Sequence, residues 1–236
     1  ENRKMSYYEH CRYRNFEGVV IVCANFDDPD VIELMNSEIP VVTIDYVHHN
    51  CTAVTSNNIQ GMEDLVKYIY SQGHRKIAYI HGQEGSSVTR DRLASFYRTI
   101  DELGLEIPDT YVRSADYLET KGSAKQTKEL LNLEDPPTCI IYPDDTSLIG
   151  GRNVIIEMGL RIPRDISVAG YDGTMISQLL YPKLTTIRQN TEMIGSEAAT
   201  RLIGTIEKPR TTLVERVVIE GSLVPGQSVG AIQPKG

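Results

Sequence analysis

The chain has 236 residues, of which 40% are hydrophobic and 24% are charged. This composition excludes a disordered or fibrous chain, and the length is sufficient to bury a core without disulfides or structural metals. The formal charge of -8 is unfavourable for binding nucleic acid. No apolar stretch approaches the roughly 20 residues that a membrane-spanning helix needs. We therefore expect a soluble, folded chain that does not bind DNA by itself.

The four cysteines, Cys11, Cys23, Cys51 and Cys139, form no CxxC pair, and each lies beside apolar residues. We predict reduced thiols that are buried or half-buried. The first residues of the chain are not followed by the apolar stretch of a secretory signal. Together these features favour a cytoplasmic protein, although a mature exported protein would also lack its signal.

Short β-branched runs alternate with amphipathic helical segments, which is typical of parallel strands joined by helical crossovers. Several runs are apolar on both faces, as expected for strands that helices cover on each side. The sequence therefore predicts an α/β fold. The predicted strands span residues 18–23, 40–45, 53–56, 76–81, 138–142, 166–171, 184–189 and 213–220.

Apolar residues recur at helical spacing in the segments between these strands. Glycines at the ends of three segments, Gly73, Gly104 and Gly159, are typical helix stops. The C-terminal tail, residues 225–236, is rich in Gly and Pro and is expected to be loose. The helices are predicted at about 58–72, 93–103, 124–131, 147–158 and 192–206, and the chain is expected to begin within a further helix.

The sequence contains none of the motifs that hold common cofactors. GxGxxG and GxxxxGK[ST] loops are absent, and so are GxSxG, HExxH and any Cys/His cluster with metal-ligand spacing. His48 and His49 are adjacent, so on an extended segment their side chains point opposite ways and a solvated loop is favoured over a metal site. We predict no cofactor and no metal.

Polar residues lie near the carboxyl ends of five predicted strands, which is where open α/β sheets bind ligands. Carboxylates accept hydrogen bonds from vicinal hydroxyls and arginine donates through a planar fork, so this set suits a neutral ligand rich in hydroxyls. The polar residues are Asp45, Arg92, Asp144, Asp145, Asp172 and Gln189. Aromatic side chains near the same ends that could stack on a sugar are Tyr46, Tyr117, Tyr142 and Tyr171.

Two other interpretations of these acids remain open. Asp144 and Asp145 precede a predicted helix and could cap it without touching a ligand, and a purely structural role is also possible for Asp172. Paired carboxylates also occur in glycosidases, but that chemistry needs a defined separation of the two groups, which the sequence does not give. We favour a binding protein over an enzyme.

Six segments of the chain resemble the effector-binding core of the lactose/galactose repressor (LacI/GalR) family. They occur in the order and spacing of that family, and the resemblance covers the chain from residue 1 to about 224. The segments are FEGVVI at 16–21, IPVVTID at 39–45, GHRKIAYI at 73–80, RLASF at 92–96, IPRDISVAGYD at 162–172 and LTTIRQ at 184–189.

The resemblance implies a fold like that of periplasmic binding proteins. Such a protein has two α/β lobes, each a parallel sheet with helices on both faces, and a ligand binds between them. We expect three crossing segments near residues 55–58, 188–190 and 215–219. The N-terminal lobe would hold residues 1–56 and 190–216, and the C-terminal lobe residues 57–189 and 217–236.

The resemblance also implies roles for single residues. Arg92 matches the arginine that grips the effector, and Asp172 matches the acid after the Gly-Tyr pair. Gln189 matches the hinge residue near the ligand, Asp45 the acid of the first lobe, and Tyr117 a frequent aromatic position. We therefore expect these five residues to contact the ligand.

The chain departs from the family pattern at several points. Asp144, also expected at the ligand, stands where the family more usually has Asn, and Glu220 replaces a frequent Arg. The DNA-binding helix-turn-helix, the first two strands and the first helix of the first lobe are all absent from this chain. We therefore expect a first lobe that is incomplete at its N-terminus.

The resemblance implies a non-catalytic, cytoplasmic sensor region of a bacterial transcriptional regulator, acting as a repressor that responds to a sugar or sugar derivative. The effector would favour one lobe angle and so change how the DNA-binding heads of a homodimer are spaced, with operator DNA bound only through the missing N-terminal domain. Purines and a phosphoprotein corepressor are alternative effectors. A periplasmic sugar-binding protein of a transporter is the alternative function.

Overall fold

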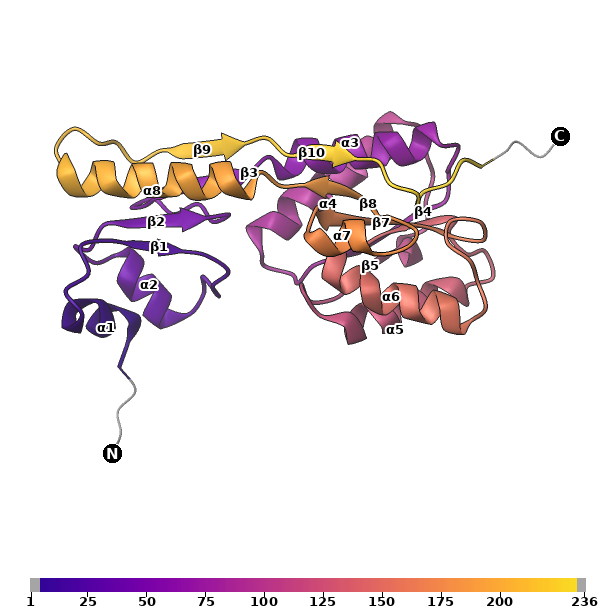
Figure 1. Cartoon of the computed structure of the whole chain (residues 1–236), viewed down its shortest axis with the longest axis horizontal. Coiled ribbons are helices and arrows are strands. Elements are labelled where there is room, and N and C mark those ends of the chain that lie inside the picture. Colours follow the sequence, from indigo (N-terminus) through magenta and orange to yellow (C-terminus); the bar gives the residue numbers. More distant parts are fainter. Residues whose placement is uncertain (1–4, 233–236) are drawn as a thin grey trace. The chain divides into compact units, whose positions relative to one another are not determined.

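The computed structural model describes residues 5–232, which divide into two compact units (Figure 1). Unit 1 contains the described residues up to Asn57 and the segment Asn190–Glu220. Unit 2 contains Asn58–Gln189 and the described residues from Gly221 onward. The chain therefore passes from one unit to the other three times.

Unit 1 is built on a parallel sheet of four strands in the order β1-β2-β3-β9. Helices lie on both faces of this sheet, because the strands carry apolar side chains on both faces. Val41 packs with α1 and α2, whereas Val42 packs with α8. The elements are α1 (Tyr7–Tyr13), β1 (Val19–Ile21), α2 (Pro29–Met35), β2 (Val41–Ile44), β3 (Thr52–Ser56), α8 (Thr191–Glu207) and β9 (Arg216–Ile219).

Local sequence signals explain where the first two helices begin. Ser6 caps α1 in a reciprocal capping box with Glu9, and Asp28 caps α2 with Pro29 in the first turn. Helix α1 begins at Tyr7, and residues 1–4, on which the expectation that the chain begins within a helix rests, lie outside the described part. The strand β9 pairs with β3 as far as Ile219, so unit 1 extends beyond residue 216, where the predicted boundary lies.

Unit 2 is built on a six-stranded sheet in the order β10-β8-β7-β6-β4-β5. All neighbouring strands are parallel except β10, which runs antiparallel to β8. The strands are β4 (Ile77–His81), β5 (Val112–Ser114), β6 (Cys139–Ile141), β7 (Ser167–Asp172), β8 (Thr185–Arg188) and β10 (Ser222–Val224).

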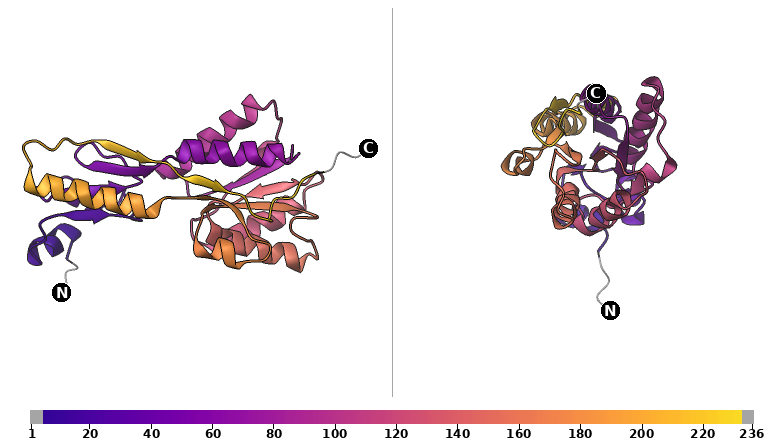
Figure 2. Two further views of the ribbon diagram at one scale, coloured as in Figure 1. Left: turned by 45° about the horizontal axis from the view of Figure 1, so that its top comes forward. Right: turned by 90° about the vertical axis from the view of Figure 1, so that its right-hand side faces the viewer.

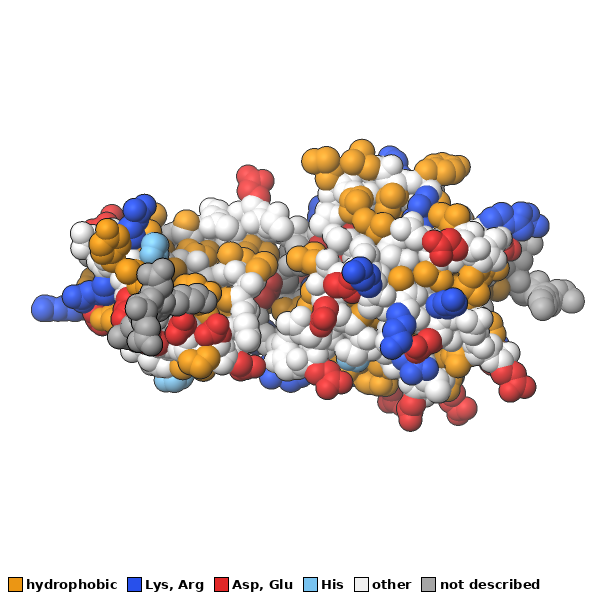
Figure 3. All heavy atoms as spheres, turned by 90° about the horizontal axis from the view of Figure 1, so that it is seen from below, with side chains coloured by type: hydrophobic (Ala, Val, Ile, Leu, Met, Phe, Trp, Pro, Cys, Tyr) orange, Lys and Arg blue, Asp and Glu red, His pale blue; other side chains and the backbone are white. Residues whose placement is uncertain are grey.

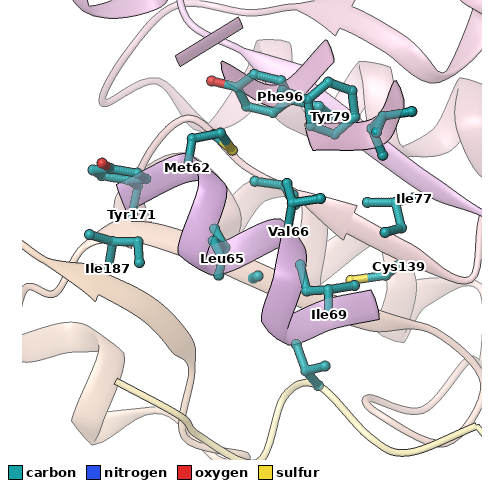
Figure 4. Close-up of a cluster of buried hydrophobic side chains, with 14 residues drawn as sticks. Met62, Leu65, Val66, Ile69, Ile77, Tyr79, Phe96, Cys139, Tyr171 and Ile187 are labelled. Atoms are coloured by element: carbon teal, nitrogen blue, oxygen red, sulfur yellow. The ribbon is translucent and has the colours of Figure 1, made fainter. Parts of the chain in front are cut away.

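Helices cover both faces of the six-stranded sheet (Figure 2). The strand β4 shows why, since Tyr79 packs with α3 and α4 whereas Ile80 packs with α5 and α6. The first of these cores surrounds Met62 and Leu65 of α3 (Figure 4). The helices are α3 (Asn58–Ser71), α4 (Ser87–Glu102), α5 (Thr120–Leu131), α6 (Asp145–Glu157) and α7 (Met175–Leu179), with a 3-10 turn at Asp109–Tyr111.

The predicted α/β fold with parallel sheets is confirmed, and each of the eight predicted strands and five predicted helices between strands is present with shifted ends. The elements α2, α7, β5 and β10, which are all short, were not predicted from the sequence. The prediction of a loose tail is wrong for residues 225–232. Ser228 is fully buried, donates to the Val168 carbonyl at 2.6 Å and accepts from the Thr185 amide at 2.8 Å. Residues 233–236 lie outside the described part.

Three of the four cysteines are buried, as predicted, and burial raises the pKa of the Cys51 thiol to about 11. The prediction is wrong for Cys23, which follows β1 with a positive φ of 53° and is exposed. Acidic and basic side chains are interspersed on the face shown in Figure 3. Among residues 5–232, no helix is long and apolar enough to cross a membrane.

Candidate functional site

Four of the six predicted site residues gather at the carboxyl edge of the unit 2 sheet. Arg92 comes from α4, Tyr117 from the loop after β5, Asp172 from the end of β7 and Gln189 from the residue after β8. These elements are far apart in sequence, but the carboxyl ends of parallel strands meet at one edge of the sheet.

Arg92 is the centre of this group and is only 3% exposed. Its guanidinium carbon lies 3.4 Å from the centroid of the Tyr171 ring, so the planar cation stacks on the aromatic face. Nε donates to Asn58 Oδ1 at 2.8 Å, and Nη1 donates to the Pro143 carbonyl at 3.0 Å. Both acceptors are neutral, so these two hydrogen bonds fix the side chain without compensating its charge.

Asp172 faces the remaining nitrogen of Arg92. Its Oδ1 lies 3.7 Å from Arg92 Nη2, beyond hydrogen-bonding distance, and accepts from Gln189 Nε2 at 2.5 Å. The Gln189 amide also donates to the Asp172 carbonyl at 3.2 Å. Asp172 has a φ of 91° and a side chain that is 25% exposed, so Gln189 orients a partly accessible carboxylate beside a buried cation.

Tyr117 lies on the other side of Arg92, with its ring centroid 6.0 Å from the guanidinium carbon. Its hydroxyl shares a hydrogen bond of 2.9 Å with Thr89 Oγ1. The ring packs on the backbone of Gly82, where an added Cβ would lie 2.1 Å from ring atoms. Burial raises the pKa of Tyr117, so its hydroxyl stays protonated.

The electrostatics of the group are consistent with a permanent cation. Burial lowers the pKa of Arg92, but the neighbouring Tyr171, Tyr117 and Asp172 outweigh that effect and raise it above its usual value. A buried, charged guanidinium with a stacking partner on one side and a carboxylate on another is suited to hydrogen-bonding a polar ligand.

Asp144 does not join this group as a ligand-facing side chain. It is 1% exposed, and its oxygens accept from the Ser147 amide, the Ser147 hydroxyl and the Leu118 amide at 2.8–2.9 Å. The carboxylate caps α6 and fixes Leu118, which has a φ of 57°. Asp144 therefore positions the loop that carries Tyr117.

Asp145 has a different structural role from the cap considered in the sequence analysis. Its carboxylate accepts from the Thr174 amide at 2.8 Å, the Thr174 hydroxyl at 3.0 Å and the Thr186 hydroxyl at 2.8 Å. Burial raises its pKa to about 6 despite these bonds, and nearby Asp172 adds to the effect. Asp145 thereby holds the turn that follows Asp172.

Asp45 belongs to unit 1, where it ends β2 with a φ of 58° and accepts from the Ser56 amide at 2.9 Å. Of the aromatic candidates, Tyr46 stacks on Phe26 with ring centroids 4.1 Å apart. Tyr142 is fully buried in the α5/α6 core and bonds Thr127 at 2.7 Å. The contacts described for these three side chains are therefore not with Arg92, Tyr117, Asp172 or Gln189.

Partners that fix Arg92 and Tyr117 were not predicted from the sequence. Asn58 begins α3, and its Oδ1 accepts a hydrogen bond from Arg92. Thr89 and the Pro143 carbonyl carry no signal that a single sequence could reveal. His48 and the exposed His49 lie in a loop of unit 1, and no group of three metal-ligating side chains occurs among the described residues.

Comparison with known families adds an independent finding. The family model described as a periplasmic binding protein-like domain matches residues 66–229, which is more than half of the chain. The match includes β4 to β8 and the whole set of Arg92, Tyr117, Asp172 and Gln189.

Similar proteins of known name are transcriptional repressors. A protein of Bacillus subtilis described as a probable HTH-type transcriptional repressor, ExuR, is 28% identical over 86% of this chain and 62% of its own length. The HTH-type transcriptional repressor PurR of Aliivibrio salmonicida is 26% identical over 87% of this chain and 62% of its own. The chain thus spans about three fifths of the length of these relatives.

Solved structures share the fold over nearly the whole chain. A transcriptional regulator LacI from Bacillus cereus subsp. cytotoxis has a TM-score of 0.88 and 25% identity, covering 96% of this chain and 80% of that one. A complex of the transcriptional regulator CelR with cellobiose has a TM-score of 0.83 and 25% identity, covering 94% of this chain and 71% of that one.

Proposed function

This chain belongs to the periplasmic binding protein-like domain family, in the group formed by the cores of LacI-type regulators, and on that premise we propose that it is the effector-binding region of a bacterial transcriptional repressor. Its role is to bind a small molecule without chemical change. The whole protein acts in the cytoplasm and contacts operator DNA through a domain outside this chain. The relatives, which are repressors, support this function over that of a transporter's sugar-binding protein.

One observation carries the proposal: the buried guanidinium of Arg92, stacked on Tyr171 and facing Asp172. We assign effector contacts to Arg92, Tyr117, Asp172 and Gln189. The arginine fork donates, the Asp172 carboxylate accepts, and the aromatic ring offers an apolar face, which together suit a sugar. The cellobiose complex of CelR supports a sugar over a purine.

We propose that effector binding is coupled to DNA binding through the two units. Unit 1 and unit 2 correspond to the two lobes, and the chain crosses between them after Asn57, Gln189 and Glu220. Gln189 is at once a crossing residue and the partner of Asp172, so an effector that contacts Asp172 acts directly on a crossing segment. The coupling is reciprocal, so operator DNA must change effector affinity by the same factor.

We also propose that the regulator acts as a homodimer. The short helix α7 and the residues after it expose three large apolar side chains, Met175 at 78%, Leu179 at 74% and Tyr181 at 83%. Large apolar side chains exposed together on one short segment suit a protein interface. Sedimentation equilibrium of the chain and of Leu179→Glu should show a dimer that the variant dissociates, and a monomeric wild type would contradict this part.

The function is tested by calorimetric titration and thermal-shift measurements with D-ribose, D-glucose, D-galactose, cellobiose, sugar phosphates and purines. A ligand at about a hundred times its Kd should stabilise the folded chain by about 2.7 kcal/mol. The shift should disappear in Arg92→Ala, which removes the fork. A cooperative melt that no compound shifts would contradict a small-molecule sensor.

A further inference from the structure

Tyr79, in strand β4, carries a hydroxyl that packing does not explain. The side chain is 0% exposed and belongs to the apolar core formed with α3 and α4. Its ring lies 5.2 Å from that of Phe96 (Figure 4). Phenylalanine would fill the same space, and a buried hydroxyl without a partner costs free energy.

The Tyr79 hydroxyl has no hydrogen-bond partner among residues 5–232. Burial raises the pKa of Tyr79, so the hydroxyl keeps its proton and is a donor. Tyr117, Arg92 and Tyr171 are the charged or titratable neighbours that act on it. Tyr79 belongs to the same buried core as Tyr171, the ring on which Arg92 stacks, so the unsatisfied donor lies in the core that adjoins the candidate site.

His81 adds a second polar group on the same face of β4, since alternate residues of a strand point the same way. The two rings are 6.1 Å apart, and His81 is 7% exposed. Its Nδ1 lies 2.7 Å from the Gly82 carbonyl oxygen, which can only accept, so Nδ1 carries the proton. In the neutral ring Nε2 is then an acceptor, and it bonds no described residue.

We propose that Tyr79 and His81 form a recognition subsite at the carboxyl end of β4 that binds hydroxyl groups of a neutral effector. This inference rests on the proposed function and deepens it. The Tyr79 hydroxyl donates to one effector oxygen beside the atom that Arg92 holds, and His81 Nε2 accepts from an effector hydroxyl. Because Tyr79 is fully buried, access to its hydroxyl requires the side chains that enclose it to shift when the effector enters.

The ligand class follows from charge and hydrogen-bond polarity. Arg92 already faces the Asp172 carboxylate at 3.7 Å, and Asp144 and Asp145 lie behind the same edge, so a further anion would be repelled. A donor and an acceptor two residues apart on one strand match a sugar, whose hydroxyls both donate and accept. An anionic effector does not match them.

The experiment is a double-mutant cycle between side chains and sugar hydroxyls. Wild type, Tyr79→Phe, His81→Phe and the control Tyr142→Phe are titrated calorimetrically with D-ribose, D-glucose, D-galactose and cellobiose, and then with the monodeoxy derivatives of each sugar that binds. Tyr142→Phe is the matched control, because it removes a hydroxyl from an equally buried tyrosine on the other face of the sheet.

We expect Tyr79→Phe to weaken sugar binding by about 3- to 10-fold, the range of one neutral hydrogen bond. The loss should vanish against the one deoxy derivative that lacks the contacted hydroxyl, and His81→Phe should behave likewise with another derivative. Tyr142→Phe should leave affinity unchanged.

Three results would overturn the subsite. Two come from this experiment: wild-type affinity in Tyr79→Phe, and a loss that is equal for every deoxy derivative and therefore structural. The third is purine binding without sugar binding in the ligand screen that tests the proposed function. Failure of the proposed function is distinct from these, because the wild-type chain would then bind no compound at all.

Discussion

The two faces of the six-stranded sheet differ in how their buried tyrosines and acids are bonded, although neither face satisfies every polar group. In α5, Ser123 Oγ and Gln126 Oε1 have no hydrogen-bond partner among the described residues. On the α5/α6 face the Tyr142 hydroxyl bonds Thr127, and Asp144 and Asp145 each accept three hydrogen bonds. On the α3/α4 face Tyr79 has no partner, and Arg92 Nη2 stops short of Asp172. The bonded Tyr142, Asp144 and Asp145 therefore stabilise the fold, whereas the Tyr79 hydroxyl can gain a partner from a bound ligand.

The largest expected effect is on the α3/α4 face and concerns Arg92. Arg92→Met keeps most of the buried volume but removes the charge and all five donors, so effector affinity should fall at least about 100-fold, or about 2.7 kcal/mol. The measurement is calorimetric titration with a sugar that the wild-type chain binds. Arg98→Met, on the exposed side of the same helix, should leave affinity unchanged. Binding of Arg92→Met within threefold of wild type would contradict the assignment.

The next effect belongs to the α5/α6 face and concerns stability. A Cβ at Gly150 would lie 1.9 Å from the Thr120 carbonyl oxygen, a backbone atom, so Gly150→Ala must push α5 and α6 apart. The free energy of unfolding should fall by about 2–3 kcal/mol, measured by urea denaturation, with the affinity of the folded protein retained.

Gly195→Ala is the control for this prediction. Gly195 lies in α8, and an added Cβ would meet no atom within 4 Å. The substitution should stabilise the chain by up to about 1 kcal/mol, because alanine favours the helix. Equal changes in the free energy of unfolding for Gly150→Ala and Gly195→Ala would show that the close packing of α5 on α6 is not what destabilises Gly150→Ala.

A smaller effect is expected from Asp145, which connects the α5/α6 face to the turn after Asp172. Its folded pKa of about 6 lies above its ordinary 3.8, so between these values the folded state binds the proton that the unfolded state has lost. Stability from this group is therefore present below about pH 4 and is lost as pH rises through 6. Removing it with Asp145→Asn should flatten the pH dependence by an amount on the order of 1 kcal/mol.

The measurement is the free energy of unfolding of wild type and Asp145→Asn from pH 4 to pH 7, with Asp165→Asn as the control. Asp165 is paired with Arg161, which lowers the pKa of its carboxyl group. Asp165→Asn should therefore not flatten the pH dependence of the free energy of unfolding between pH 4 and pH 7. Identical profiles for wild type and Asp145→Asn would show that Asp145 does not titrate in this range.

The smallest effect compares the two buried tyrosines directly. Tyr142→Phe removes a satisfied hydrogen bond and should lower the free energy of unfolding by about 1 kcal/mol, whereas Tyr79→Phe removes an unsatisfied hydroxyl and should leave stability equal or raise it. Thermal unfolding of the ligand-free variants measures both. Equal destabilisation by the two substitutions would remove the distinction between the faces.

Much of the fold could be predicted from the sequence because its signals are local. Met62, Leu65, Val66 and Ile69 have helical spacing and do form the buried side of α3. The short elements α2 and α7 give too few turns for a periodic pattern. The tail was misjudged because its glycines suggest mobility, whereas Ser228 is held by β7 and the start of β8, far away in sequence.

In the candidate site, too, local features could be predicted from the sequence, whereas contacts between distant segments could not. Asp172 and Gln189 at strand ends, and Arg92 and Tyr117 in the segments that follow β4 and β5, could be predicted as site residues, and the structure brings them together. The division of labour between Asp144 and Asp145 could not, because adjacent acids before a helix look alike in sequence.

The sequence by itself determined the α/β class, the order of its main strands and helices, and the strand ends at which polar residues accumulate, since periodicity and capping act over a few residues. Only the tertiary structure decided which polar groups are satisfied. It paired Asp144 with Leu118 and Asp145 with Thr186, and left Tyr79 without a partner. A hydrogen bond depends on donors and acceptors that distant segments bring within about 3 Å, a distance that no local pattern encodes.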